Sequence, residues 1–257
     1  EMMRKKTEEH FTADSWSYTE DGYLMFSGTG ALDEMYVMTL SDVKEYAALR
    51  VEPLDEACRE WNEKALLPVG YECNNLFLTD WDETDFGELD FYDLFDVFYP
   101  QIYHRKIPWQ SGKNAGNSTV YGIPSKEFES VIQKFLNVKT DILREKTIYR
   151  EKDDTYEYYP RGFYESEYPE HPYPEVTAFQ ENDDGTVTLT VHAVFPYLGS
   201  SRALVHEVTV RPMENAAAAV RYVSNKIVSS LDDPDDNWYV PRLSREERSL
   251  LYEENTD

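Results

Sequence analysis

A strict alternation of apolar and polar residues is the feature of this chain that most constrains its fold. From Val187 to Phe195, apolar residues occupy every second position, and polar residues separate most of them. A period of two residues predicts a strand with one buried and one exposed face. The Asp184-Gly185 pair just before it predicts a hairpin turn, because glycine tolerates the positive φ that such a turn needs. Residues 176–180 then form the other strand of the hairpin.

Two later segments, Ala203–Arg211 and Val220–Val228, have the composition of further strands of the same sheet. The register of the first of them follows from the apolar pattern, since a slip by one residue would send every apolar side chain to the other face. The register that keeps the apolar side chains together pairs Val187 with Val210, Leu189 with Val208 and Ala193 with Leu204.

His192 and His206 lie on these two strands. Two histidines on neighbouring strands can bind a metal ion if they share a face of the sheet. The register above sends them to opposite faces. A metal site at this pair is therefore not expected.

Helical periodicity is confined to short segments. Apolar residues recur at helical spacing over residues 91–102, in a helix that we expect to end near Pro100, and again after Ser125. Shorter helices are expected after Ser41, after Pro53, over Asp141–Lys146 and after the capping box Ser244–Glu247.

Other segments predict short strands or irregular structure. The aromatic runs Trp16–Tyr18 and Tyr23–Phe26 predict a small hairpin, and Asn75–Thr79 predicts a short strand. The segment Asp153–Pro174 contains four prolines. Because proline cannot donate to a ladder, we expect this segment to be extended without regular pairing.

Together these elements predict an α+β fold. A mostly helical N-terminal portion precedes a C-terminal antiparallel sheet of about four strands, with helices packed on one face. Residues 1–122 then form a mainly helical region with a small N-terminal hairpin, and residues 123–257 form a helix-plus-sheet region. The alternative is one continuous domain, which a chain of 257 residues is long enough to form.

The charge of the chain narrows the classes of partner. Fifty acidic and 25 basic residues give a formal net charge of −25. Such a field repels nucleic acids and anionic lipid surfaces, whereas a saccharide, a peptide or a protein remains a suitable partner. No apolar stretch approaches the roughly 20 residues that span a bilayer. Membrane contact is expected only through an N-terminal anchor removed upstream of Glu1.

Two cysteines, Cys58 and Cys73, are too few for a disulfide scaffold. Cys58 lies on the apolar face of the helix expected after Pro53, where it suits the role of a small buried hydrophobe. A single bridge between the two in an oxidising compartment is the alternative.

The chain contains none of the common catalytic motifs, so no catalytic, cofactor-binding or metal-ligating residue is assigned. The acidic run that starts at Asp80 is similar to a calcium loop, but Asp85 stands at the sixth position and Phe91 at the twelfth, where an EF-hand needs glycine and glutamate. The acidic turn Asp232–Asn237 leaves a loosely held surface calcium ion as the single cofactor hypothesis.

Aromatic residues in turn-rich segments are the remaining functional lead. Aromatic rings on loops can stack on sugars or bind the prolines of a peptide. The alternative is that the same rings anchor an irregular segment to the core. The possible ligand contacts are Trp109, Trp238, Tyr156, Tyr158, Tyr164 and Tyr168.

Residues 123–228 resemble a family of uncharacterised extracytoplasmic lipoproteins of Gram-positive anaerobes, a domain of unknown function. The matching segments are Ile123-Pro-Ser-Lys-Glu-Phe128, Thr155-Tyr-Glu-Tyr-Tyr-Pro-Arg-Gly162, Tyr173-Pro-Glu-Val176, Asp184-Gly-Thr-Val-Thr-Leu-Thr-Val191, His206-Glu-Val-Thr-Val-Arg-Pro212 and Tyr222-Val-Ser-Asn-Lys226. The resemblance implies a lipid-anchored cell-surface protein and supplies no catalytic residues. The chain departs from the pattern at Asn215–Ala219, where a turn with glycine is expected.

Three functional hypotheses follow. The first is a secreted or lipid-anchored, non-enzymatic surface protein that binds a ligand or partner through its aromatic loops. The second is a hydrolase that acts on a cell-envelope or dietary polymer through an unrecognised carboxylate pair. The third is an accessory subunit whose partner covers the tyrosine-rich segment.

Overall fold

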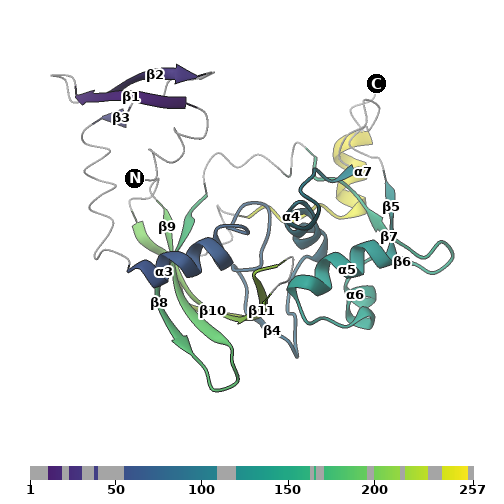
Figure 1. Cartoon of the computed structure of the whole chain (residues 1–257). Helices are drawn as coiled ribbons and strands as arrows, with labels where there is room; N and C mark the ends of the chain where they lie inside the picture. The colour runs from purple at the N-terminus through teal and green to yellow at the C-terminus, as the bar shows by residue number, and fades with distance from the viewer. Residues whose placement is uncertain are drawn as a thin grey trace. The chain divides into compact units, whose positions relative to one another are not determined.

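The computed structural model describes residues 11–18, 23–30, 38–39, 55–108, 120–162, 165, 171–195, 200–214, 218–230 and 239–253 (Figure 1). The chain divides into two compact units, Glu1–Pro53 and Leu54–Asp257. The boundary follows Pro53, whereas the sequence suggested a division near residue 122. Residues 55–108 instead share a core with the residues that follow.

The smaller unit contains a three-stranded antiparallel sheet. Its strands are β1 (Phe11–Tyr18), β2 (Tyr23–Gly30) and β3 (Met38–Thr39), in that spatial order. Tyr18 pairs with Leu24 across the turn. The predicted N-terminal hairpin is therefore confirmed, and the helix expected after Ser41 lies outside the described residues.

A five-stranded antiparallel sheet is the larger of the two sheets that the structure describes in the second unit. Its spatial order is β4-β11-β10-β9-β8. The sequence predicted four of these strands and missed β4, a two-residue edge strand from the N-terminal half. The strands are β4 (Trp81–Asp82), β8 (Tyr173–Glu181), β9 (Val187–Phe195), β10 (Ser200–Pro212) and β11 (Val220–Ser230).

The register predicted from the apolar pattern is confirmed. Val187 pairs with Val210, Leu189 with Val208 and Ala193 with Leu204. The β8–β9 turn also forms as predicted, with Gly185 at φ 78°. The apolar face of β9 is buried, which gives the helices a surface to cover.

The helices of this unit are short and amphipathic. They are α3 (Glu56–Trp61), which continues as a π-helical turn over Asn62–Leu66, α4 (Phe91–Tyr103), α5 (Ser125–Phe135), α6 (Thr140–Lys146) and α7 (Arg245–Glu253). α3 lies against β8, and α4 packs along α5 (Figure 1). Stacked aromatic rings connect the helices to the sheet. The centre of the Phe98 ring in α4 lies 4.1 Å from that of Phe135 in α5 and 6.2 Å from that of Tyr222 in β11.

Helix ends follow local capping more closely than proline positions. α4 runs past Pro100 and ends at His104, whose left-handed backbone (φ 50°) lets its N–H donate to the Pro100 carbonyl at 2.9 Å. The helix predicted over 91–102 is therefore confirmed, and its last residue lies three residues beyond Pro100. The Ser244–Glu247 capping box is confirmed, since the Ser244 N–H donates to the Glu247 carboxylate at 2.8 Å and the Glu247 N–H to the Ser244 hydroxyl at 3.3 Å.

A second sheet of this unit corrects another prediction. Strands β5 (Tyr121–Pro124), β6 (Tyr149–Arg150) and β7 (Thr155–Tyr158) form an antiparallel sheet of order β5-β7-β6. The sequence predicted no regular pairing over 153–174. β7 nevertheless pairs on both sides, because the first proline of that segment, Pro160, comes two residues after the strand ends.

Two further predictions are resolved by local structure. Asn75–Thr79 forms turns instead of a strand, because the Asn74 and Asn75 side chains bind backbone groups. The Leu76 N–H donates to Asn74 Oδ1 at 3.1 Å, and Asn75 Nδ2 donates to the Glu88 carbonyl at 2.7 Å. Cys58 is buried, as its apolar helix face predicted, and both cysteines are free. Burial also raises the pKa of the Cys58 thiol to about 11.

Candidate functional site: a buried arginine–carboxylate network

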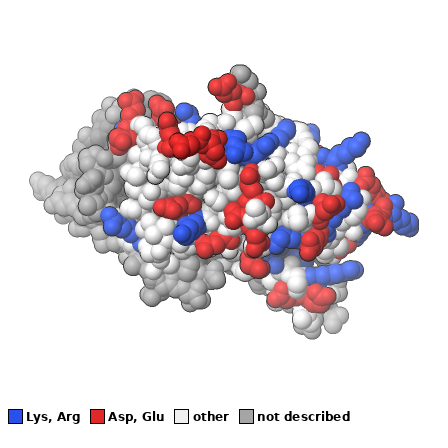
Figure 2. Space-filling model, turned by 90° about the horizontal axis from the view of Figure 1, so that it is seen from below, with Lys and Arg blue, Asp and Glu red and all other residues white. Residues whose placement is uncertain are grey.

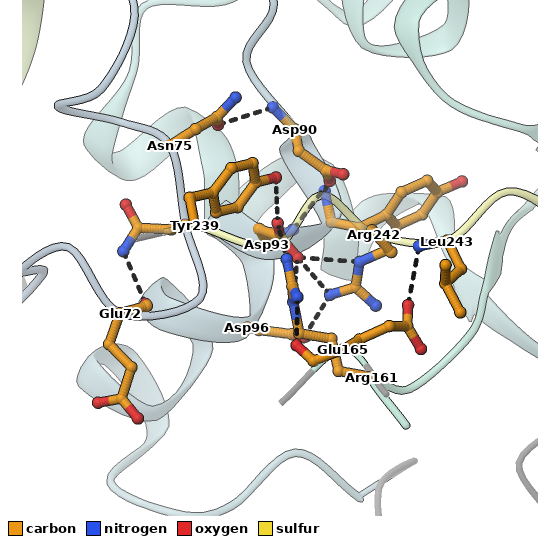
Figure 3. A network of polar contacts seen from close by, with 12 residues as sticks. Glu72, Asn75, Asp90, Asp93, Asp96, Arg161, Glu165, Tyr239, Arg242 and Leu243 are labelled. Atoms are coloured by element: carbon orange, nitrogen blue, oxygen red, sulfur yellow. Dashed lines mark hydrogen bonds and ion pairs between the residues drawn. The ribbon is translucent and has the colours of Figure 1, made fainter. Parts of the chain in front are cut away.

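Helix α4 carries three aspartates at intervals of three residues, on an otherwise apolar helix. Asp90 caps the helix, since its carboxylate accepts hydrogen bonds from the N–H groups of Tyr92 and Asp93 at 2.8 and 3.0 Å. Residues three apart on a helix lie on neighbouring parts of its surface. Asp93 and Asp96 therefore point from α4 towards the segments around residues 161 and 242, as Figure 3 shows.

Asp93 is the centre of this network and is completely buried. One of its oxygens accepts hydrogen bonds from the Nε atoms of Arg161 and Arg242, each at 2.9 Å. The other accepts from Arg161 Nη2 and from the Tyr239 hydroxyl, the latter at 2.7 Å. A buried carboxylate requires this number of donors, because an unpaired charge away from water is costly.

Asp96 extends the network one turn further along α4. Its two oxygens accept from the Tyr158 hydroxyl at 2.7 Å and from Arg242 Nη2 at 2.6 Å. Arg242 also donates to the Tyr159 carbonyl. Arg242 thus joins α4, the end of β7 and the chain just before α7.

Glu165 forms a second centre beside the first. Its carboxylate accepts from the N–H groups of Gly162 and Leu243, each at 2.9 Å, and from Arg248 Nη2 at 2.6 Å. Arg161 links the two centres, because its Nη1 donates to the Glu165 carbonyl at 2.7 Å. Arg248 comes from α7, so the capping box that starts this helix also positions a member of the network.

The charges of the network shift the proton affinities of its members. Burial would lower the pKa of Arg161 and Arg242, but the adjacent aspartates outweigh it and raise both, so the guanidinium groups stay charged. Burial raises the pKa of Asp96, against the effect of Arg242. Burial and the charge of Asp93 raise the pKa of Asp90 to about 6.

The network is chemically closed. Both oxygens of Asp93, Asp96 and Glu165 have donors, and the side chains of Arg161, Arg242 and Arg248 are at most 8% exposed. Such an arrangement can hold three distant segments of the chain in fixed positions. It offers no free carboxylate oxygen at Asp93, Asp96 or Glu165 to a substrate.

The structure separates the aromatic residues proposed as ligand contacts. Tyr156 and Tyr158 are completely buried, which corrects the expectation that their rings are exposed. Their hydroxyls donate to Glu129 and Asp96, at 2.9 and 2.7 Å, so both anchor β7 to the core. The other four proposed contacts lie outside the described residues, namely Trp109, Trp238, Tyr164 and Tyr168.

The two histidines lie on opposite faces, as the register predicted. His206 pairs with Val191 and points into the core, where its Nε2 lies 2.8 Å from the Tyr71 hydroxyl and its Nδ1 lies 2.7 Å from Asn225 Oδ1. Within the described residues, no three or more His, Cys, Asp or Glu side chains form a group that could hold a metal ion. The acidic turn at 232–237, the basis of the calcium hypothesis, is not among them.

None of the charged members of the network was predicted from the sequence. Asp90, Asp93 and Asp96 recur with the helical period inside an apolar helix, which is a signal that could have drawn attention to them. Arg161, Glu165, Arg242 and Arg248 are separated from Asp96 by 65 residues or more and carry no comparable signal.

The fold and this network define an α+β protein whose C-terminal segment is held to a central helix by buried ion pairs. The chain belongs to a family of unknown function, DUF6070, whose model matches residues 1–242. No curated protein and no solved structure matches it. None of the helices in the described part of the chain is both long enough and apolar enough to cross a bilayer.

Proposed function

We propose that this chain is a non-enzymatic module that binds a ligand or partner, within a secreted or lipid-anchored surface protein. The observation that carries the proposal is the closed network. Its buried carboxylates serve as counter-ions for three arginines, so the most acidic part of the interior contributes to a rigid scaffold.

The chemistry of hydrolysis explains why this observation favours binding. A general acid or base must reach the reacting atoms, and its proton affinity must suit the working pH. Asp93 and Asp96 are instead held by the permanently charged Arg161 and Arg242. Every oxygen of these two carboxylates already accepts a hydrogen bond from a protein donor, so neither carboxylate is placed to exchange a proton with a substrate.

One observation favours the alternative, a hydrolase that acts on a cell-envelope or dietary polymer. Asp90 has a pKa raised to about 6, as a general acid requires. Its carboxylate accepts the two N-terminal amide bonds of α4, which gives it a structural role as well.

The location of the protein is a separate part of the proposal. The resemblance of residues 123–228 to extracytoplasmic lipoproteins supports a cell-surface protein. Fractionation of the source cells, followed by detection with an antibody, tests it. Recovery in the soluble cytoplasmic fraction would contradict this location.

A thermal-shift panel of neutral oligosaccharides, peptides and Ca²⁺ tests the binding function, because a ligand specific for the native state raises Tm. We expect a shift without product formation when the same mixtures are analysed by mass spectrometry. The hydrolase alternative predicts products that disappear in Asp90→Asn and persist in the matched control Asp153→Asn, an exposed aspartate. That second result would overturn the proposal.

A further inference from the structure

The exposed end of α4 presents an aromatic ring between two cations. Tyr103, the last residue of α4, is 36% exposed. The Arg105 guanidinium lies 5.4 Å from the centre of its ring, and Lys134 Nζ, from α5, lies 6.0 Å from it. We call these three residues the Tyr103 surface. Phe179 of β8 is also exposed, and the centre of its ring lies 6.4 Å from that of Trp61.

Contacts with the buried Tyr99 hold Arg105, one member of the Tyr103 surface, in place. Arg105 Nη2 donates to the hydroxyl of the buried Tyr99 at 2.8 Å, and its guanidinium also lies 5.7 Å from the Tyr99 ring. The Tyr99 and Tyr103 rings are 4.6 Å apart. Contact with two rings limits the rotamers of Arg105, so less entropy is lost when it binds an anion.

Neither cation of the surface has a carboxylate partner among the described residues. The arginines of the buried network all have one, and so do Arg144, Arg150 and Arg211 at the surface. Glu127 affects the Tyr99 hydroxyl electrostatically but forms no ion pair with Arg105 or Lys134. Other exposed cations, such as Arg59 and Lys126, also have no carboxylate within ion-pair distance among the described residues. Arg105 and Lys134 differ from them because both lie within 6.0 Å of the centre of one exposed ring.

We propose that the Tyr103 surface binds an acidic segment of a partner protein, in which neighbouring Asp or Glu carboxylates meet Arg105 and Lys134. The inference rests on the proposed binding function and names the kind of partner. Guanidinium and ammonium groups complement carboxylates, and the Tyr103 hydroxyl adds a donor.

A short acidic segment fits this surface better than a long polyanion. The net charge of −25 repels any extended anion that must cross other parts of the surface. At physiological salt the Debye length is about 8 Å, so a compact ligand is attracted mainly by the cations next to it. On the face in Figure 2, acidic and basic side chains are interspersed and leave no large patch of one sign.

The test uses the full chain and a fluorescein-labelled, capped peptide with three consecutive glutamates, measured by fluorescence anisotropy at about 0.15 M salt, where the Debye length is about 8 Å. The double variant Arg105→Gln/Lys134→Gln removes both cations. The matched control Arg202→Gln/Lys226→Gln removes two exposed cations elsewhere and makes the same change in net charge. Arg105→Lys retains the charge but not the planar fork.

We expect saturable binding that weakens about tenfold or more in the double variant and is unchanged in the control. Lys134→Gln alone keeps the test informative if loss of the Arg105–Tyr99 contact unfolds the protein. Equal weakening in both double variants, or no binding by the wild-type chain, would overturn the inference. Binding of oligogalacturonate but not of the peptide would also overturn it. If the panel above still shows another ligand, the proposed function survives that failure.

Discussion

Two buried polar networks lie in the larger unit, and they are built from opposite chemistry. One is the ionic network of Asp93, Asp96 and Glu165 with their arginines. The other is neutral and joins Tyr71 to His206 and Asn225, two buried residues of the five-stranded sheet. In the neutral network each donor meets one acceptor: the Tyr71 hydroxyl donates to His206 Nε2, His206 Nδ1–H donates to Asn225 Oδ1, and Asn225 Nδ2 donates to the Thr79 carbonyl at 2.7 Å.

The two networks depend on the fold in different ways. His206 and Asn225 lie on adjacent strands, so their meeting follows from the register of β10 and β11. A charged group needs several partners when it is buried, and no single element can supply them. The ionic network therefore draws on α4, the chain after β7 and the start of α7, and it exists only when all three are in place.

The largest expected effect tests whether the ionic network holds these segments together. In Asp93→Asn, Arg161 and Arg242 lose their shared counter-ion while the shape of the side chain is retained. Breaking a buried ion pair lowers the free energy of unfolding by about 3–5 kcal/mol. Urea unfolding measures it, with Asp153→Asn as the exposed control. A variant as stable as the control would show that the network contributes no net stability.

The next prediction concerns the pH dependence of the free energy of unfolding, to which the two networks contribute with opposite signs. Burial lowers the pKa of His206 from 6.5 to about 4. Below pH 6.5 the unfolded chain takes up a proton that the folded chain refuses. The stability that His206 contributes is therefore complete above pH 6.5 and is lost as the pH falls towards 4, by up to about 3 kcal/mol.

Asp90 in the ionic network acts in the opposite direction. Its folded pKa is raised from 3.8 to about 6, so its contribution increases as the pH falls between these values. Unfolding curves of wild type and His206→Gln between pH 7 and 4 isolate the histidine. An identical pH dependence in the two proteins would mean that His206 is not the titrating group.

A smaller effect is expected from a single neutral hydrogen bond. Tyr71→Phe removes the hydroxyl that donates to His206 Nε2 and leaves a buried acceptor. The free energy of unfolding should fall by about 1–2 kcal/mol, less than for Asp93→Asn. Tyr103→Phe, which removes an exposed hydroxyl, serves as the control. If Tyr71→Phe destabilised the protein more than Asp93→Asn, the neutral network would contribute more to stability than the ionic one, contrary to this prediction.

The smallest effect lies at the edge of the ionic network. Ser244→Ala removes the side-chain half of the capping box of α7, the helix that carries Arg248. Loss of an exposed N-cap should lower the free energy of unfolding by about 0.5–1 kcal/mol. Thermal unfolding followed by circular dichroism measures it, and Ser229→Ala, at an exposed position of β11, is the control. An unchanged Tm would indicate that Arg248 alone positions α7.

Sequence patterns predicted the elements whose cause is local. The β8–β9 turn follows from Asp184-Gly185, the register of β9 and β10 from their apolar alternation, and the start of α7 from Ser244 and Glu247. Two of the failures have non-local causes. β4 is a strand because β11 offers an edge to Trp81 and Asp82, and β7 pairs because β5 and β6 lie on either side of it.

The candidate site shows the same division. The amino-acid pattern specifies which strand faces are apolar, and hence that His192 and His206 cannot share a face, because side-chain direction alternates with a period of two. It also set the helical spacing of Asp90, Asp93 and Asp96. Which arginines meet these aspartates, and the burial of Tyr158 beside Asp96, depend on tertiary packing. The partners of a buried charge come from distant segments, and their meeting depends on the packing of the whole unit.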